Sequence, residues 1–364
     1  MAPNSPSMGR FANAHGRPLP TRRGASCTLP LAETRLREEA VRTSRDVITQ
    51  RLLAALLLVL VVWLLLVPLA NLVVRSPTTA LTQFMNGLSY SLLIFLIATG
   101  FSLIFGMMNF VNLAHGAFYM LGAYIAYSIV GRNTNNFWLA LLAAPLAVAA
   151  IAVILEWGYL RPLYKRGHLD QVLLTFGFAF VFSDMVRAIW GADIRSLPRP
   201  PQLDGTVTLF GWSYPQYRFS TIVFGLAVAV LLWLLLERTR LGSIVRAGVA
   251  DPEMVSGLGI NITVVFAAVF AIGAALAALS GVVAGPILGM APGMDFDVLI
   301  VALIVVVVGG LGTFSGSFWG SLLIGVADTF GKVLQPDFSM ALTFAVMAAV
   351  LLLRPAGLFG RPEA

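Results

Sequence analysis

The stretch Asn109-Phe-Val-Asn112-Leu-Ala-His115-Gly116 lies inside residues 76–131, which contain no Asp, Glu, Lys or Arg. A helix that faces lipid does not readily carry two Asn and a His, because each polar side chain costs free energy in hydrocarbon unless it faces other protein or water. Polar residues at membrane depth therefore indicate a path through the membrane. The alternative interpretation is a polar turn at the membrane surface that joins two helices, since Asn and Gly are common turn residues.

The composition defines the class of protein. Hydrophobic residues make up 58% of the 364 residues and charged residues only 11%, and the mean hydropathy is +0.86. A soluble domain has roughly 25% charged residues. We therefore expect an all-α, polytopic transmembrane helical bundle of eight to ten spans, with short or broken helices. The expected spans are 52–74, 84–105, 117–130, 138–157, 172–190, 221–236, 264–286, 298–311, 318–330 and 340–353.

The net charge of +7 is concentrated at the N-terminus, where residues 1–51 hold nine Arg and four acidic residues. Such a segment before a first span indicates a cytoplasmic N-terminus, and no basic-aromatic pattern indicates nucleic-acid binding. Residues 1–30 have the composition of a disordered segment, and 31–51 are compatible with a helix. Cys27 is the only cysteine, which excludes an intrachain disulfide and a cysteine metal site.

The loops predict the orientation of the later spans. Basic residues in 161–166 and 238–246, together with Arg354 and Arg361 near the C-terminus, indicate that these segments face the cytoplasm. Residues 191–219 must then face outward. Within them, 206–212 read as a small β-hairpin with a Gly turn.

A second informative stretch follows the span 221–236. Asp251 can cap a helix that begins at Pro252, Glu253 suits the helix dipole, and Gly257 or Gly259 can end the helix. A short, capped helix between two spans is a rigid element through which a soluble partner can move the bundle. A plain solvated connector is the alternative interpretation.

Several motifs in consistent order from Leu81 to the C-terminus resemble the H-type permease subunit of bacterial branched-chain amino acid ABC importers. The strings that carry the resemblance are Asn86-Gly-Leu-Ser89-Tyr-Ser, Asn109 to Tyr124, Arg246-Ala-Gly-Val-Ala-Asp251, Gly257-Leu-Gly259-Ile-Asn261, Val308-Gly309-Gly310-Leu-Gly312-Thr-Phe-Ser-Gly316 and Pro355 to Glu363. The region before Leu81 has no counterpart in simple members of the family. We therefore divide the chain into a basic cytoplasmic tail (1–51), an extra span and linker (52–80) and the permease domain (81–364); a wrongly assigned start site is the other explanation for residues 1–80.

The resemblance implies a permease of the bacterial inner membrane. It also implies a second permease subunit, two cytoplasmic ATPase subunits and a periplasmic substrate-binding protein as partners. Its substrates would be amino acids, branched-chain ones in the first place, with other amino acids, amides and urea left open. We expect the translocation pathway at Asn86, Ser89, Asn109, Asn112, His115, Gly116 and Asp328, ATPase coupling at Arg246, Asp251, Glu253, Gly257, Gly259 and Asn261, and close helix packing or a helix break at Gly309, Gly310, Gly312 and Gly316.

No motif for catalysis is apparent. Gly331-Lys332 lacks the upstream Gly and the following hydroxyl of a phosphate-binding loop, and the glycines at 310, 312 and 316 lack the spacing of a dinucleotide fingerprint. We expect no catalytic residue, cofactor or metal. Asp328, which has no evident local partner in the sequence, is the residue on which the rival interpretation rests: a proton-coupled secondary transporter of small polar or amphipathic solutes.

Overall fold

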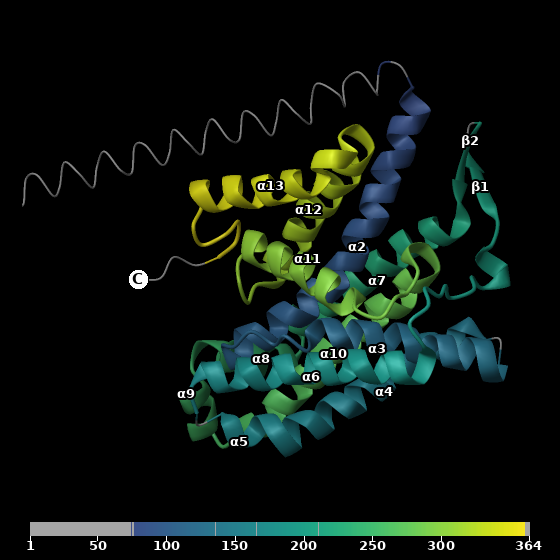
Figure 1. The fold of residues 1–364 in the computed structure, drawn as a ribbon. Helices are drawn as coiled ribbons and strands as arrows, with labels where there is room; N and C mark the ends of the chain where they lie inside the picture. Colours follow the sequence, from purple (N-terminus) through teal and green to yellow (C-terminus); the bar gives the residue numbers. More distant parts are fainter. Residues whose placement is uncertain (1–73, 75, 135, 165, 210, 361–364) are drawn as a thin grey trace, which may run out of the picture. The chain divides into compact units, whose positions relative to one another are not determined.

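The computed structural model describes residues 74, 76–134, 136–164, 166–209 and 211–360. The expected basic tail and all but the last residue of the expected span 52–74 lie outside these residues. Within them the fold is almost entirely helical (Figure 1). Its helices are α2 (Pro77–Met108), α3 (His115–Ser128), α4 (Phe137–Leu155), α5 (Arg161–Leu163), α6 (His168–Trp190), α7 (Gln216–Arg238), α8 (Arg240–Ala250), α9 (Pro252–Gly257), α10 (Ile262–Leu288), α11 (Met294–Gly309), α12 (Phe314–Leu334) and α13 (Ser339–Leu353).

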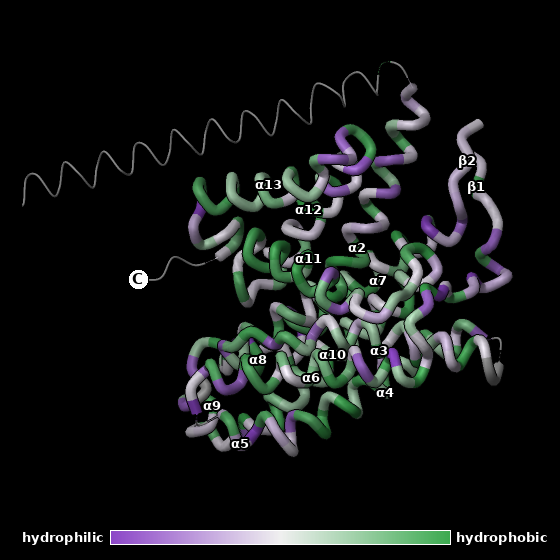
Figure 2. The backbone as a smooth tube through the Cα atoms, in the orientation of Figure 1, coloured by the Kyte–Doolittle hydropathy of each residue, from purple (hydrophilic) through white to green (hydrophobic). Residues whose placement is uncertain are grey.

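The prediction of an all-α polytopic bundle with short or broken helices is confirmed. In the described part of the chain, six helices are long and apolar enough to cross a membrane, or seven if α11 and α12 count as one bent span. The expected span 52–74 lies outside this count, and α3 with 14 residues and α11 with 16 are too short to cross alone, since a crossing takes about 20. Figure 2 shows hydrophobic residues along the helices, with hydrophilic residues gathered at helix ends and connections.

Helix α2 is the central element. It has 32 residues, and its C-terminal half is buried against α10, α12 and α7. Glycines permit the close approach: a Cβ on Gly87 would lie 3.3 Å from the Val326 Cα of α12, and one on Gly225 would lie 2.7 Å from the Leu92 Cβ. Small residues at helix crossings let the backbones come together and gain dispersion energy in a membrane.

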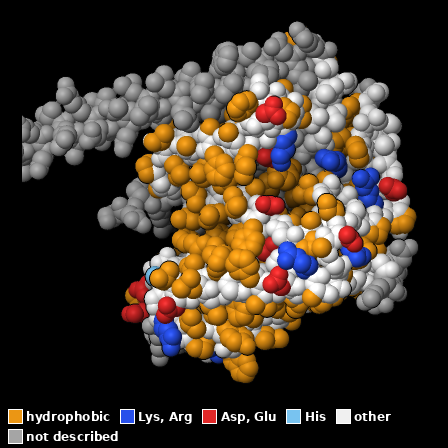
Figure 3. Space-filling view, viewed as in Figure 1, with side chains coloured by type: hydrophobic (Ala, Val, Ile, Leu, Met, Phe, Trp, Pro, Cys, Tyr) orange, Lys and Arg blue, Asp and Glu red, His pale blue; other side chains and the backbone are white. Residues whose placement is uncertain are grey.

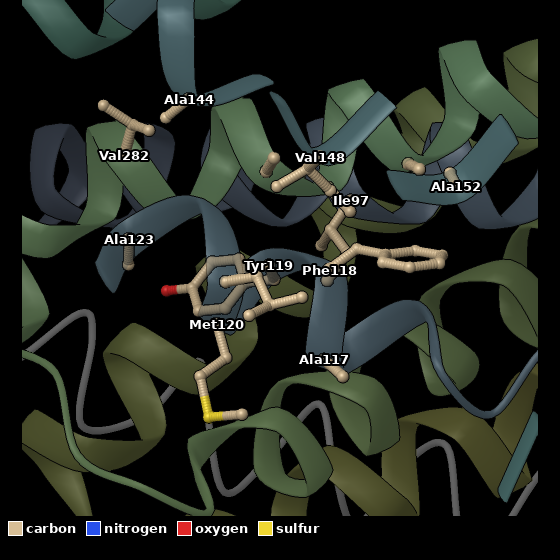
Figure 4. Close-up of a cluster of buried hydrophobic side chains, with 14 of the residues drawn as sticks. Ile97, Ala117, Phe118, Tyr119, Met120, Ala123, Ala144, Val148, Ala152 and Val282 are labelled. Carbon is tan, nitrogen blue, oxygen red and sulfur yellow. The ribbon is translucent and has the colours of Figure 1, made fainter. Parts of the chain in front are cut away.

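A second packing centre surrounds α3. Figure 4 shows Phe118, Tyr119 and Met120 of α3 among buried side chains of the neighbouring helices. Ala144, Val148 and Ala152 of α4 repeat every four residues, form one face of that helix and are fully buried. This small-residue stripe brings α4 against α10 and α3, as the 3.6-residue period requires.

The predicted β-hairpin is confirmed. Strands β1 (Thr206–Leu209) and β2 (Trp212–Pro215) pair antiparallel, from Thr206 opposite Pro215 to Leu209 opposite Trp212. Gly211 closes the turn with φ of +80°, a conformation that glycine adopts without a Cβ clash. The Trp212 indole Nε1 donates to Thr82 Oγ1 at 2.9 Å, which fastens the hairpin to the first turns of α2.

Candidate substrate cleft

Two adjoining cavities lie between α2, α10, α11 and α12. Each has a volume of about 220 Å³, and they share Tyr90, Leu93, Leu288 and Lys332 as lining residues. We refer to the two together as the cleft. Figure 3 shows one face of the molecule, on which basic and acidic side chains stand among many hydrophobic ones.

One cavity of the cleft is polar. Asn86, Ser89 and Asp328, which the sequence analysis assigned to a pathway, line it together with Arg218 of α7. Asn86 Oδ1 accepts hydrogen bonds from the Arg218 Nη1 at 3.0 Å and from the Tyr214 hydroxyl at 3.1 Å. Burial raises the pKa of Tyr214, against an opposing effect of Arg218, so the hydroxyl is protonated and can donate at neutral pH. Asn86 therefore holds the guanidinium in the lining of the polar cavity.

An ion pair lies at the junction of the two cavities. Lys332 Nζ is 2.6 Å from Asp328 Oδ2 and 5.2 Å from the centre of the Tyr90 ring. The expectation that Asp328 has no local partner is wrong, because Lys332 lies one helical turn later on α12, the spacing at which side chains meet on a helix. Asp328 is largely shielded from solvent and Lys332 is exposed.

The other cavity is mainly apolar. Leu93, Ile94 and Ile97 of α2 line it together with Val298 and Val301 of α11, and Asp297 is a charged member of the same lining. Ser280 also lines it, but its hydroxyl donates to the Leu93 carbonyl at 2.8 Å and is thereby satisfied within the bundle. The cleft as a whole therefore offers charged groups at one end and aliphatic side chains at the other.

The polar string 109–116 lies elsewhere: none of its residues lines either cavity. It forms the break between α2 and α3. Asn109 is exposed and caps α2 with φ of +52°, whereas Asn112 and His115 are 1% and 0% exposed. The string thus connects two helices, and its central residues are buried in protein.

Hydrogen bonds explain the residue types in this break. Asn112 Oδ1 accepts from the Ala114 amide at 3.1 Å, and His115 Nε2 lies 3.0 Å from the Ile97 carbonyl in the middle of α2. Gly116 lies directly against the Asp295 carbonyl at the start of α11, where a Cβ would clash. The His115 imidazole joins α3 to α2, and the absence of a Cβ at Gly116 lets α11 pack directly against α3.

We expect His115→Leu to lower the free energy of unfolding by about 1–3 kcal/mol, because it removes a buried hydrogen bond to α2. The measurement is the thermal unfolding of the detergent-solubilised protein. Asn109→Gly is the matched control, because glycine also adopts positive φ at this exposed position. A His115→Leu protein as stable as the parent would show that the bond contributes nothing.

The four glycines of the 309–316 segment lie at the bend of 117° between α11 and α12. Gly310 and Gly312 have φ of +108° and +74°. Gly309 and Gly316 lie against each other, so that a Cβ on either would overlap the other's carbonyl. The last carbonyls of α11 are satisfied from outside the helix: the Leu358 amide donates to the Val308 carbonyl and the Phe359 amide to the Gly309 carbonyl, both at 2.9 Å.

The 238–261 stretch forms two helices, α8 and α9, at the end of the bundle opposite the hairpin (Figure 1). Asp251 Oδ1 accepts from the Met254 amide at 2.9 Å and caps α9, whose last residue is Gly257; Gly259 has φ of +83°. Asn261 caps α10 through the Thr263 amide at 3.1 Å. Arg246 lies on α8, 3.5 Å from the exposed Glu237, and Glu253 is exposed in the first turn of α9.

Sequence reasoning missed several residues of the cleft and of the α8–α9 segment. Arg218 and Lys332 line the cleft, and Met254 and Leu258 project from α9 and its cap with 65% and 74% exposure. The i,i+4 spacing of Asp328 and Lys332 could have revealed their pair. Met254 and Leu258, two apolar residues four apart in a short polar segment, could have revealed the apolar surface of α9. Nothing in the local sequence places Arg218 beside Asn86, which is 132 residues away.

A helical membrane bundle with a broken helix pair and an amphipathic cleft defines a multi-pass membrane protein of the transporter class. Residues 83–351 match the family described as "Branched-chain amino acid transport system / permease component". The chain is 34% identical over 303 residues to the high-affinity branched-chain amino acid transport system permease protein BraD of Pseudomonas aeruginosa, covering 78% of this chain and 96% of BraD. It is 28% identical over 298 residues to the permease protein LivH of Escherichia coli K12, covering 78% and 96%. The chain belongs to this permease family, which confirms the resemblance read from the sequence motifs.

Proposed function

We propose that this chain is a permease subunit of an ATP-driven importer of branched-chain amino acids and forms part of the translocation pathway. The observation that carries the proposal is the family match over residues 83–351, together with relatives named for branched-chain amino acid transport. An amphipathic cleft inside the bundle agrees with a substrate that has a charged head and an aliphatic side chain. Other amino acids, amides and urea remain the alternative substrates, since a separate binding protein would select among them.

The partners in this proposal are a second permease subunit, two cytoplasmic ATPase subunits and a periplasmic substrate-binding protein. Coupling to the ATPases is assigned to α8, α9 and their caps, with Arg246, Asp251, Glu253, Gly257, Gly259 and Asn261 as the residues of the segment. The exposed Met254 and Leu258 support this assignment, because apolar side chains on a short rigid helix can seat in a groove of a soluble partner. ATP hydrolysis then belongs to the partner subunits and not to this chain.

For the cellular location, we propose the bacterial inner membrane, with the N- and C-termini in the cytoplasm. Basic residues in the α4–α6 connection and around α8 support this orientation. The hairpin, whose Tyr214 donates to Asn86 of the polar cavity, would then face the periplasm. We keep the division into a tail (1–51), an added span and linker (52–80) and the permease domain (81–364), since the family match begins at residue 83.

The test is uptake of radiolabelled L-leucine into proteoliposomes that hold the permeases and ATPases, with the binding protein outside. We expect uptake to require ATP at the ATPase face and to persist when an ionophore abolishes the proton gradient. The pairing of Asp328 with Lys332 gives no support to a lone, proton-carrying acid. Uptake by the permease without ATPases, driven by a pH gradient, would contradict the proposal and favour a secondary transporter.

A further inference from the structure

Arg218 is a cation with capacity for an anionic ligand. Its hydrogen bond from Nη1 to Asn86 Oδ1 uses one of the five N–H donors of a guanidinium. Among the described residues Arg218 forms no ion pair within 4.0 Å, although it lines the polar cavity. A guanidinium held by a neutral amide, and not by a carboxylate, keeps its charge available for a carboxylate of the ligand.

The Asp328–Lys332 pair supplies both signs of charge beside Arg218. Their contact uses Oδ2 of the carboxylate, so Oδ1 is a second acceptor on a residue that lines the same cavity as Arg218. An α-amino acid carries an ammonium and a carboxylate on one carbon. When such a ligand enters, Asp328 can exchange the Lys332 ammonium for that of the ligand, while Lys332 and Arg218 take the carboxylate. Asp328, which is largely shielded from solvent, keeps a cationic partner throughout the exchange, which avoids the large cost of an unpaired buried charge.

The apolar cavity begins where this charged cluster ends. Lys332 and Leu288 line both cavities, and beyond them the lining is mostly aliphatic side chains of α2 and α11, with Tyr119, Ser280 and Asp297 as its polar members. A ligand whose charged head lies at Lys332 therefore places its side chain against Leu93, Ile97 and Val298. Burial of an aliphatic side chain there gains about 0.8 kcal/mol for each CH₂ group removed from water.

We propose that the cleft is a binding site for the zwitterion of an aliphatic amino acid, with Arg218 and Lys332 holding its carboxylate, Asp328 its ammonium, and the α2–α11 cavity its side chain. The permease is then a selective element in its own right and not a passive pore. This inference rests on the proposed function, because it identifies where the transported amino acid binds.

The test measures occupancy without transport. In a Cys27→Ser background, which removes the only native cysteine, Leu288→Cys places a thiol at the junction of the two cavities, where Leu288 is 53% exposed. The rate of labelling by a small methanethiosulfonate reagent is measured on the full-length permease in nanodiscs. We expect L-leucine to slow labelling by about tenfold at ten times its dissociation constant. Ile194→Cys, an exposed site in the 191–200 segment, is the control whose labelling L-leucine leaves unchanged.

Two ligand analogues test the charges without altering the protein. Leucinamide lacks the carboxylate and 4-methylpentanoate lacks the ammonium, and we expect each to protect only at concentrations about tenfold or more above that of L-leucine.

Arg218→Gln should impose a similar loss of protection by L-leucine, and Arg218→Lys should restore part of that protection. Arg238→Gln, the same change at the other end of α7, is the matched control. L-leucine should protect the thiol in this variant as well as it does in the parent.

The outcomes separate this inference from the proposed function. If the importer takes up leucine with ATP while leucine fails to protect Leu288→Cys, the binding site is wrong and the importer assignment stands. Equal protection by leucine and both analogues would overturn recognition of the two charges. Protection by leucine in a protein that shows no ATP-driven uptake with its partners would support the site and contradict the importer.

Discussion

Replacement of Gly281 by valine is expected to abolish the folded permease. A Cβ on Gly281 of α10 would overlap the Tyr119 carbonyl oxygen of α3 and lie 3.3 Å from the Ala123 amide nitrogen. Both obstacles are backbone atoms, so no side chain can move aside. Overpacking of a close-packed site typically costs 1–3 kcal/mol, and we expect at least about 3 kcal/mol here because two whole helices must separate.

The measurement for Gly281→Val is the yield of monodisperse protein after solubilisation and its thermal unfolding midpoint. Gly177→Ala on α6 is the matched control, because a Cβ there meets no atom within 4 Å. Alanine in a helix is favoured over glycine by about 0.5–1 kcal/mol, so the control should be as stable as the parent or more so. Normal yield and stability of Gly281→Val would show that α3 and α10 can separate without loss of the fold.

The double replacement Met254→Asp and Leu258→Asp is expected to lower ATP-driven uptake at least about tenfold while leaving the permease folded. Both side chains are exposed, Met254 on α9 and Leu258 at its C-cap, so charge there costs the isolated subunit little. An apolar groove on an ATPase subunit would, in contrast, have to take up two unpaired carboxylates, which is strongly unfavourable.

Ser256→Asp is the control for the α9 replacement, since it adds a charge at an exposed position of the same helix without removing an apolar side chain. Co-purification of the ATPase subunits with each variant separates lost association from lost transport. Full co-purification and full uptake by the Met254→Asp, Leu258→Asp protein would place the ATPase contact elsewhere on this chain.

Features set by residues close together in the chain could be predicted from the sequence. The helix start at Pro252 follows from the Asp251 side chain and the fixed φ of proline, and the hairpin turn follows from Gly211 between two β-rich strings. The apolar helices likewise follow from hydropathy. In each case the information lies within one or two turns of chain.

The cleft could not be predicted in the same way. The sequence assigns Asn86 and Asp328 to one pathway together with the 109–116 string, but only the crossing of α2 and α12 places these two on one cavity, and Arg218 reaches it from α7. His115 shows the opposite case: its residue type indicated function, yet the structure gives it a helix-to-helix hydrogen bond in a fully buried site. A polar residue in an apolar segment has both explanations, and only its neighbours in space decide between them.

The bonds from residues 358 and 359 to the end of α11 have a consequence for biosynthesis. The Val308 and Gly309 carbonyls receive their partners about 50 residues later in the chain, from amides that the ribosome adds after α12 and α13. Until then, the broken end of α11 must find water or another temporary partner, because bare carbonyls are costly in lipid. The C-terminal segment therefore completes the maturation of this bundle. A chain stalled on the ribosome before residue 358 lacks the amides that bond the Val308 and Gly309 carbonyls at the bend between α11 and α12.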